Sequence, residues 1–209
     1  MHVTVFGATG GVGRSLMTQL HEEGHTVTAF TRDRARLDPD APGLNIVEGD
    51  VLDLDAVRQA IEGSDAVICA LGMPLFNREK LRTKGTAVIV QAMEQVGIKR
   101  LVCLSGLGAG DSWPMLPLRY RWFIVPLFMR RLYDDHEAQE AVVRASKLYW
   151  TIVRPSSFTD GARTRAYQVG FTAALPSLTY KIARADVADF MVRQLEDNTY
   201  LHASPALSH

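Results

Sequence analysis

The stretch VTVFGATGGVGRSL, residues 3–16, decides the fold of this chain. It opens with a short β-branched and apolar run, VTVF, which is typical of a buried strand. Gly7, Gly10 and Gly13 follow at intervals of three, and the apolar residues after them recur with the spacing of a helix. Evenly spaced glycines alone are a weak signal, but a strand before them and a helix after them predict the first βα turn of a parallel sheet.

A glycine-rich turn between a strand and a helix can bind phosphate. Glycines let the backbone approach a pyrophosphate, whose charge meets free N–H groups and the positive end of the helix dipole. The alternative is a tight turn that binds nothing. We predict cofactor contacts from this turn at Gly7, Thr9, Gly10, Gly11, Val12 and Gly13.

Strand and helix patterns alternate along most of the chain. Further strands are predicted at residues 26–30, 44–47, 66–70, 100–104 and 149–153. Helical stripes lie at Val12-Leu16-Leu20, at Val57-Ile61 and at Leu81-Val88-Ala92-Val96, and a last helix is predicted over 186–195. The alternation predicts a Rossmann-type doubly wound α/β fold with a parallel sheet, with residues 1–209 as a single domain. Irregular segments at about 106–135 and 155–182 are expected on the substrate side.

Composition and charge narrow the class of protein. The chain has 209 residues, 23 of them basic and 23 acidic, so its formal net charge is zero, which disfavours a nucleic-acid-binding protein. There is no apolar run of about 18 residues to predict a membrane span, and the first residues do not resemble a signal peptide. Cys69 and Cys103 lie in short apolar runs and are expected to be buried free thiols, with no metal site. These features predict a cytoplasmic protein.

Three arginines follow the predicted second strand in AFTRDRARL, residues 29–37. In a dinucleotide site this position faces the adenosine ribose, where an acid selects NAD and a basic residue accommodates the 2′-phosphate of NADP. Arg32 occupies the position here, so we expect its planar guanidinium to bind that phosphate. Arg36 could reach the same phosphate from the following loop, whereas Arg34 is expected to face solvent. The alternative for all three is a solvated loop with weak local Arg–Asp pairs.

Two further strand ends are predicted to contact the cofactor. Asp50 and Val51 follow the third strand, where an acid and backbone groups can reach the adenine. Leu71 and Gly72 end the fourth strand, and the glycine lets the chain pass close to the ribose and pyrophosphate. Either loop could instead be an ordinary strand-ending turn.

These motifs together resemble the atypical short-chain dehydrogenase/reductases of the NmrA-like group, and most of all its small NADPH-dependent flavin reductases, also called biliverdin-IXβ reductases. The resemblance spans nearly the whole chain. It rests on FGATGGVGR (6–14), TRDRARL (31–37), GDVLD (49–53), ALG (70–72), DDHEAQEAVVRAS (134–146), YWTIVRP (149–155) and IARADVADFMVRQL (182–195).

The resemblance implies NADP(H) bound along the strand ends, with the nicotinamide near Leu104, Ser105 and Pro155. A flat conjugated acceptor, such as a free flavin, a bilin or a quinone, would stack over the nicotinamide and take the hydride as a substrate. The chain departs from the small reductases on the acceptor side, where Arg154-Pro155-Ser156-Ser157 replaces a Pro-Pro-His-Ile run. This departure bears on the choice of acceptor and not on the cofactor.

Ordinary short-chain dehydrogenases use a Tyr-x-x-x-Lys pair, and none of the six tyrosines here has a lysine four residues on. Carbonyl reduction or epimerisation by that pair is therefore not expected. Ser105 ends the fifth strand and could bind the acceptor or the carboxamide, or only cap a turn with Gly106. His136 could donate a proton or position the nicotinamide, because histidine titrates near neutrality, or it could lie exposed at the start of a helix over 137–145. A non-catalytic NADP(H) sensor of the NmrA-like type is the competing function.

Residues 113–132, WPMLPLRYRWFIVPLFMRRL, stand apart from the rest of the chain. Three prolines and four arginines argue against a membrane-spanning helix. The segment could be a lid over a flat anionic acceptor, a self-association surface, a membrane-surface patch or a helix packed on the core.

Overall fold

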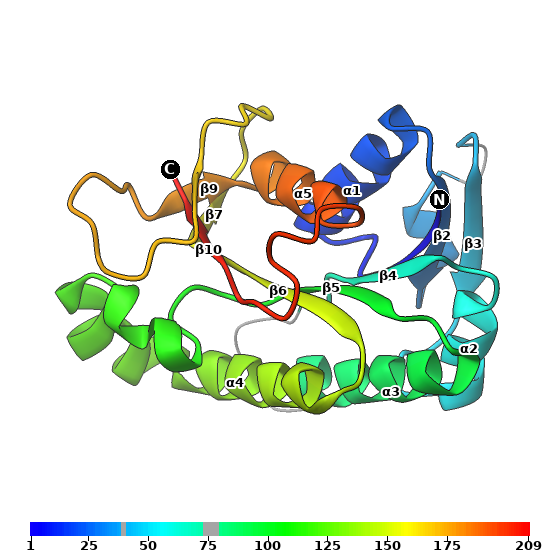
Figure 1. Ribbon diagram of the computed structural model, residues 1–209, viewed down its shortest axis with the longest axis horizontal. Helices are drawn as coiled ribbons and strands as arrows, with labels where there is room; N and C mark the ends of the chain where they lie inside the picture. Colours follow the sequence, from blue (N-terminus) through cyan, green and yellow to red (C-terminus); the bar gives the residue numbers. More distant parts are fainter. Residues whose placement is uncertain (39–40, 73–79) are drawn as a thin grey trace.

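The computed structural model describes residues 1–38, 41–72 and 80–209, and an eight-stranded sheet runs through its centre (Figure 1). In spatial order its strands are β3 (Leu44–Glu48), β2 (Thr26–Thr31), β1 (His2–Phe6), β4 (Ala66–Cys69), β5 (Arg100–Leu104), β6 (Tyr149–Pro155), β10 (Ala206–Ser208) and β8 (Gln168–Val169). Neighbouring strands are parallel except for β10 and β8, which pair antiparallel. The order β3-β2-β1-β4-β5-β6 confirms the predicted doubly wound Rossmann-type fold.

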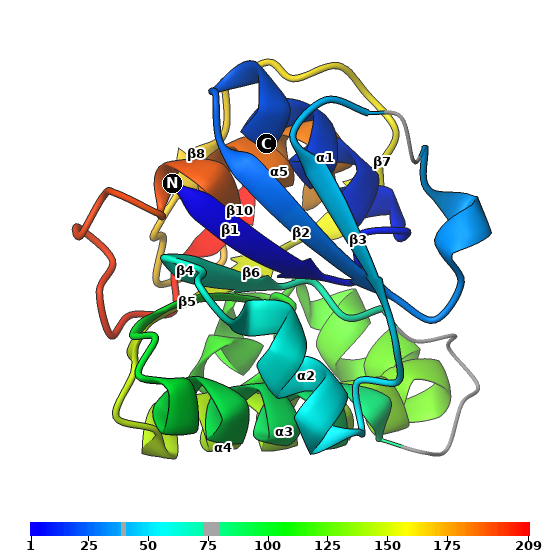
Figure 2. The same cartoon turned by 90° about the vertical axis from the view of Figure 1, so that its right-hand side faces the viewer.

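Helices cover both faces of the sheet (Figures 1 and 2). The helices α1 (Gly11–Glu22) and α5 (Arg184–Arg193) lie on one face, and α2 (Leu54–Ile61), α3 (Leu81–Val96) and α4 (Arg130–Ala145) lie on the other. The remaining short elements are η1 (Arg34–Arg36), η2 (Gly110–Met115), η3 (Tyr120–Met129) and the paired strands β7 (Ser157–Thr159) and β9 (Lys181–Ala183). Strand order reverses between β1 and β4, so the crevice at their carboxyl ends is where this fold binds ligands.

Each face of the sheet buries its own apolar core. Leu16 and Leu20 of α1 are fully buried in one core, and Val57 and Ile61 of α2 are fully buried in the other. The helical stripes predicted for these two helices are therefore confirmed. Burying a leucine or isoleucine side chain contributes about 1.5–3 kcal/mol, so the two cores hold the helices firmly against the sheet.

The helix predicted from the stripe is confirmed as α3, and Leu81 and Val88 of the stripe pack partly buried against the core. Of the four stripe residues only Ala92 is fully buried, and Val96 is 39% exposed. The buried face consists of Arg82, Gly85, Thr86, Ile89, Val90, Ala92 and Met93. Because α3 packs on the sheet and also between α2 and α4, its buried arc is wide and includes polar residues that an apolar pattern misses.

Three other boundaries differ from the sequence-based expectation. The helix α4 begins at Arg130 and not at residue 137, because the polar run around His136 is helical although it breaks the apolar pattern. The last helix spans Arg184–Arg193 instead of 186–195. Within the expected irregular segment, η2 and η3 are both helical, and η3 is wound as a π-helix that runs directly into α4.

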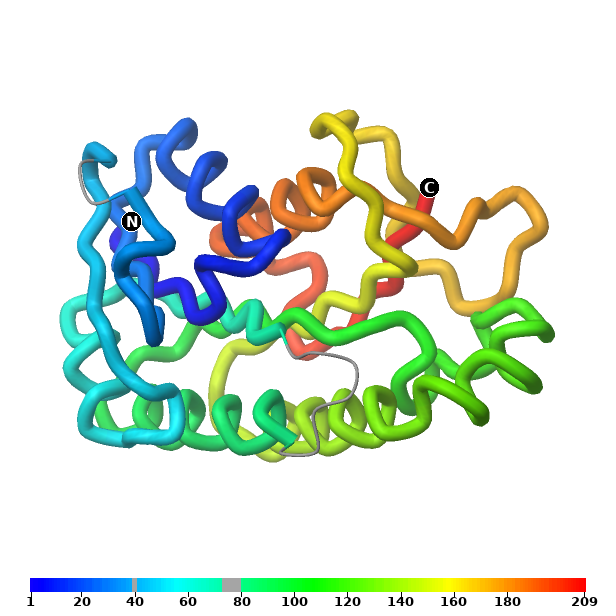
Figure 3. Tube along the Cα trace, turned by 180° about the vertical axis from the view of Figure 1, so that it is seen from behind, coloured from blue at the N-terminus to red at the C-terminus, as the bar shows by residue number. Residues whose placement is uncertain are grey.

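The two long excursions from the sheet meet at one end of the molecule. Figure 3 shows the green segment around residues 106–129 and the yellow-orange segment around 160–180 on the side away from the N-terminus. A small apolar core joins them, made of Leu107, Leu116, Val125 and Ala206, with Phe171 and Tyr180 packed against it. Within the described residues, no helix is both long enough and apolar enough to cross a bilayer.

Candidate active site

Two glycines of the first turn are required by backbone packing. Gly7 has φ of +87°, and a Cβ there would lie 2.2 Å from the carbonyl oxygen of Ala70. A Cβ on Gly13 would lie 2.1 Å from the carbonyl oxygen of Gly7. The turn therefore packs directly against the end of β4 and against the first turn of α1, which only glycine permits.

The N-terminus of α1 opens into the crevice without a cap. Gly10 is the N-cap and no side chain satisfies the first N–H groups of the helix, which belong to Gly11, Val12 and Gly13. Arg184, in the first turn of α5, lies over this turn, with its Cδ and Nε 2.6 Å from where a Cβ on Gly11 would be. A guanidinium beside the positive end of a helix is unfavourable unless an anion lies between them. The turn and Arg184 together fit a pyrophosphate.

Arg184 is held in place by two neighbours. Its Nη1 donates to Asp160 Oδ1 at 2.5 Å, and its guanidinium lies 5.3 Å from the centre of the Phe158 ring. These contacts position the side chain over the turn before any ligand binds, which lowers the ordering cost of binding.

The three arginines after β2 are all exposed, and none of them forms an ion pair within the described part of the chain. Asp33, their acidic neighbour, accepts instead from the backbone N–H of Ala35 and begins the short helix η1. No ion pair joins these arginines to Asp33, and their exposure fits the alternative of a solvated loop as well as a free phosphate site. Arg32 directly follows the last residue of β2, beside the crevice, which is the position expected of a ribose-phosphate ligand.

The loops after β3 and β4 pack together beside this position. A Cβ on Gly85 of α3 would lie 2.9 Å from Leu71 Cδ1 and 3.0 Å from Val51 Cγ1, so α3 approaches both side chains closely. Asp50 accepts from the backbone N–H of Leu52 and stays exposed. Gly72, the next residue after Leu71, is exposed as well.

A continuous cavity of about 560 Å³ runs from the glycine turn to the far end of the molecule. Many of the residues predicted from the sequence line it, namely Gly10, Gly11, Val12, Leu71, Gly72, Leu104, Ser105, His136 and Pro155. Five other predicted residues do not line the cavity, namely Thr9, Arg32, Arg36, Asp50 and Val51. Gly7 and Gly13 do not line it either, but they allow the close backbone packing of the turn that does. The far end is apolar and aromatic, with Leu116, Tyr120, Met129, Leu132, Tyr133 and Tyr180.

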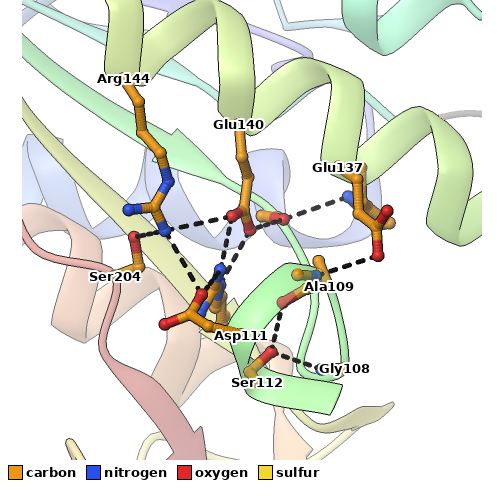
Figure 4. Close-up of polar contacts among 12 residues, drawn as sticks. Gly108, Ala109, Asp111, Ser112, Glu137, Glu140, Arg144 and Ser204 are labelled. Carbon is orange, nitrogen blue, oxygen red and sulfur yellow. Dashed lines mark hydrogen bonds and ion pairs between the residues drawn. The ribbon is translucent and has the colours of Figure 1, made fainter.

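A buried polar network lies beneath the ends of β5 and β6, and Figure 4 shows several of its members around Glu140. Glu140 Oε1 accepts from Ser105 Oγ at 2.7 Å and from Arg154 Nε at 2.9 Å, and Oε2 accepts from Arg154 Nη2 at 2.6 Å. Arg154 also donates to Asp111 at 2.7 Å, and this hydrogen bond lowers the pKa of the Asp111 carboxyl. The two-pronged Arg154–Glu140 pair holds the acceptor of the Ser105 hydroxyl in one place.

His136 is buried in α4, so the alternative of an exposed histidine is wrong. Burial lowers the pKa of His136 to about 3, and the charge of Arg82 adds to the effect. The imidazole is therefore neutral near pH 7, which favours the expected positioning role over proton donation.

Ser105 selects the tautomer of His136. The Ser105 hydroxyl donates its single proton to Glu140, so Ser105 Oγ can only accept from His136 Nδ1, 3.4 Å away. The imidazole proton is then on Nδ1, and Nε2 is left as a hydrogen-bond acceptor. The pair can accept from an N–H group of a ligand, such as a carboxamide, but it does not hold a proton ready to donate.

Arg82 is a further polar group that reaches the cavity. It lies in the first turn of α3, buried beside Asp135, and its Nη1 has no hydrogen-bond partner within the described residues. Burial lowers the pKa of this guanidinium. Asp135 is held by Thr83, whose Oγ1 donates to Asp135 Oδ1 at 2.6 Å. Arg82 Nη1 lies 3.7 Å from Asp135 Oδ2, so the guanidinium is ion-paired although this atom makes no hydrogen bond to any described residue.

Comparison with known proteins agrees with this geometry. A family model described as NAD(P)H-binding matches residues 7–198. The chain belongs to the NAD(P)H-binding family. This membership and the shared fold of solved short-chain dehydrogenase/reductases support the expected resemblance to the atypical, NmrA-like group.

Among curated relatives, the chain is 30% identical over 205 residues to the UPF0659 protein YMR090W of Saccharomyces cerevisiae, covering 93% of this chain and 87% of the yeast protein. Two solved structures share the fold. A short-chain dehydrogenase/reductase from Veillonella parvula, in complex with NADP, has a TM-score of 0.84 and 19% identity, covering 100% of this chain and 94% of that one. ChuY, an anaerobilin reductase from Escherichia coli O157:H7, has a TM-score of 0.81 and 24% identity, covering 99% and 96%.

Four residues in or beside this candidate site were missed from the sequence: Arg82, Glu140, Arg154 and Arg184. One signal was available, because Glu140 lies four residues after His136 and so shares its helix face. The packing of α3, β6 and α5 brings the other three near the crevice, and although Arg154 and Arg184 lie in the quoted family motifs, no spacing rule singled them out.

Proposed function

We propose that the protein is an NADPH-dependent reductase of a flat conjugated acceptor. The observation that carries the proposal is the continuity of the cavity, which leads from an uncapped helix N-terminus, past Ser105 and His136, to an apolar and aromatic end. A dinucleotide that binds along the strand ends would place its phosphates at the helix N-terminus and its nicotinamide beside Ser105 and His136. The apolar and aromatic end is then free for a second planar molecule.

We propose NADP(H) as the preferred form of the cofactor. The support is Arg32, an exposed guanidinium without an ion-pair partner in the described residues, at the position where NAD-selective sites carry an acid. Arg36 stands three residues beyond the Asp33 cap and assists Arg32, while Arg34 stays in solvent. A solved relative of this fold is in complex with NADP, which agrees with the assignment.

The residues act by binding and orienting. The neutral His136 accepts from the carboxamide of the nicotinamide, and Ser105 holds the histidine in that tautomer through Glu140. Arg82 binds an oxygen of the ligand, and the aromatic end excludes water from the acceptor face. The bound cofactor supplies a hydride, the acceptor takes up that hydride and a proton from water, and the oxidised cofactor remains.

We propose a free flavin, a bilin or a quinone as the acceptor class. The aromatic lining supports a flat molecule, and ChuY, an anaerobilin reductase, has a related activity on the same fold. A cytoplasmic location is proposed as well, because Cys69 and Cys103 are register partners on adjacent strands and remain free thiols, which suits a reducing compartment.

The test is steady-state NADPH oxidation, followed by absorbance, with FMN, biliverdin and a short-chain quinone offered separately. At least one acceptor is expected to be reduced, and NADH is expected to be a poorer donor. Tight NADPH binding with no reduction of any acceptor would contradict the proposal and favour the non-catalytic sensor.

The Arg184→Met variant tests the cofactor path in the same assay. Losing a charge-assisted contact to a phosphate is expected to weaken NADPH binding about tenfold or more. Arg163→Met is the matched control, because Arg163 is also an ion-paired arginine near α1 but does not line the cavity. Equal affinities of the two variants would show that Arg184 does not face the cofactor.

A further inference from the structure

The helix η3 exposes more large apolar surface than any other described part of the molecule. Trp122, Phe123, Leu127 and Phe128 of η3, and Leu118 in the turn that leads into it, are each between 67% and 71% exposed. Scattered single apolar side chains are normal on a protein surface, but five in one helical segment form a contiguous patch that points to an interaction. We call these five residues the outer face of η3.

The π-helical winding of η3 separates two faces cleanly. In a π-helix each residue bonds to the fifth along, so residues four and five apart lie on the same side. The outer face has this spacing, and so does an inner face of Tyr120, Ile124, Val125 and Met129. Val125 packs into the small core with Leu107 and Leu116, so η3 is already anchored by its inner face and the outer face remains uncovered.

The charge around the outer face is uniformly positive. Arg119, Arg121, Arg130 and Arg131 flank it, and no acidic residue occurs between Asp111 and Asp134. None of these four arginines forms an ion pair with another described residue, although the chain as a whole is neutral. An apolar face bordered only by arginines matches the interface of an anionic bilayer, where aromatic side chains enter the headgroup region and cations meet lipid phosphates.

A second copy of the chain fits this surface poorly. A two-fold interface brings the same patch of both copies together, so the arginines of one copy would face those of the other. Like charges in contact across an interface oppose association. The surface is therefore complementary to an anionic partner and not to itself.

The inner face connects this surface to the cavity. Tyr120 and Met129 line its apolar end, so one helix carries the acceptor wall on one side and the exposed patch on the other. We propose that the outer face of η3 docks on an anionic bilayer and brings the acceptor end of the cavity to a membrane-dissolved, long-chain quinone. This rests on the reductase function proposed above. The balanced step is quinone plus NADPH plus a proton from water, giving hydroquinone and NADP⁺.

Docking is tested without cofactor or substrate, by flotation of the full chain with vesicles. Vesicles of phosphatidylglycerol mixed with phosphatidylcholine are expected to carry the protein upward at low salt, and raised salt is expected to weaken this binding. Pure phosphatidylcholine vesicles are expected to bind less. Absence of the wild-type protein from the anionic vesicles would overturn the proposal, whatever the enzyme assays show.

Two variants separate the apolar and the charged contributions. Trp122→Ser/Phe123→Ser and Arg130→Glu/Arg131→Glu are each expected to reduce vesicle binding at least about tenfold. The matched control is Arg58→Glu/Lys99→Glu, which reverses two exposed charges away from η3 and is expected to bind as the wild type does. Circular dichroism checks that each variant folds, and the acidic pair suits the start of α4. Loss of binding by the control would overturn the assignment to η3.

Turnover then tests delivery of the acceptor. The wild type is expected to reduce a long-chain quinone in anionic vesicles and a short-chain quinone in water, whereas both η3 variants keep only the second activity. Equal reduction of the long-chain quinone by wild type and variants would overturn delivery. If the wild type binds vesicles but reduces neither quinone, the acceptor assignment and the proposed reductase function are contradicted. This outcome differs from failed docking, in which the wild type does not bind the vesicles. If the wild type instead forms dimers and does not bind vesicles, and the Trp122→Ser/Phe123→Ser variant is monomeric, the outer face is a self-association surface and the membrane proposal is wrong.

Discussion

Replacing Glu140 by alanine removes the main partner of a buried arginine. The side chains of Glu140 and Arg154 are 5% and 1% exposed, so water cannot replace the lost carboxylate. Removing one member of a buried ion pair costs about 3–5 kcal/mol. Asp111, whose side chain is 74% exposed, keeps one hydrogen bond to Arg154, which places the expected loss at about 3–4 kcal/mol. At about 2–4 °C for each kcal/mol in a chain of this size, the Tm falls by about 6–16 °C.

The assay is urea unfolding of Glu140→Ala, Arg154→Met and the double variant, with thermal unfolding as a second measure. Removing both partners leaves no buried charge, so the double variant is expected to lose at least about 1.5 kcal/mol less than the sum of the single losses. Asp111→Asn is the control, and because Asp111 is exposed it should cost under about 1 kcal/mol. Single losses that simply add, or a Glu140→Ala loss no larger than that of the control, would refute the buried-pair reasoning.

Three further predictions follow from the site. Arg32→Ala should weaken NADPH by about 1.5–3 kcal/mol more than NADH, measured as Kd for both cofactors, and equal losses would show that Arg32 does not bind the 2′-phosphate. The pKa of His136 is lowered to about 3 from 6.5, so the unfolded chain binds a proton that the folded chain excludes between these values. The contribution of His136 to the free energy of unfolding should therefore be fully present above pH 6.5 and be lost as the pH drops towards 3. The loss should reach up to about 1.4 kcal/mol per pH unit, and His136→Gln should lack this part of the pH dependence. Parallel pH profiles for wild type and variant would count against the buried neutral imidazole. Gly13→Ala places a Cβ 2.1 Å from the Gly7 carbonyl oxygen and should cost about 1–3 kcal/mol in urea unfolding, whereas Gly10→Ala, whose nearest atom is at 3.3 Å, should cost less.

The fold was predictable because its signals are local. The strand before Gly7 and the helix after Gly13 are read within a few residues, and the alternation of short apolar runs with helical stripes repeats that unit along the chain. Once several strands are parallel, connection rules leave few possible orders, and the observed order is one of them.

Local signals failed where packing involves more than one neighbour. The stripe predicted for α3 assumed one buried side, but α3 has buried sides against the sheet, α2 and α4, and it buries Arg82 and Thr86 among apolar residues. The start of α4 was placed too late for a related reason, since its polar first turns carry Asp135 and His136 inward. A polar residue reads as exposed unless its partner is known, and the partner lies far away in sequence.

The candidate site also combines features that the sequence determines with features that only the tertiary structure decides. Sequence alone determined the strand–glycine–helix turn, the cation at Arg32 and the strand ends that carry Leu104, Ser105 and Pro155, because each depends on the backbone course of a few consecutive residues. Tertiary structure decided what these groups can do. Burial makes His136 neutral, Glu140 takes the proton of Ser105, and the winding of η3 turns five apolar side chains outward. A pKa, a tautomer and an exposed face all depend on which distant groups exclude water from a residue, and only the folded chain sets that.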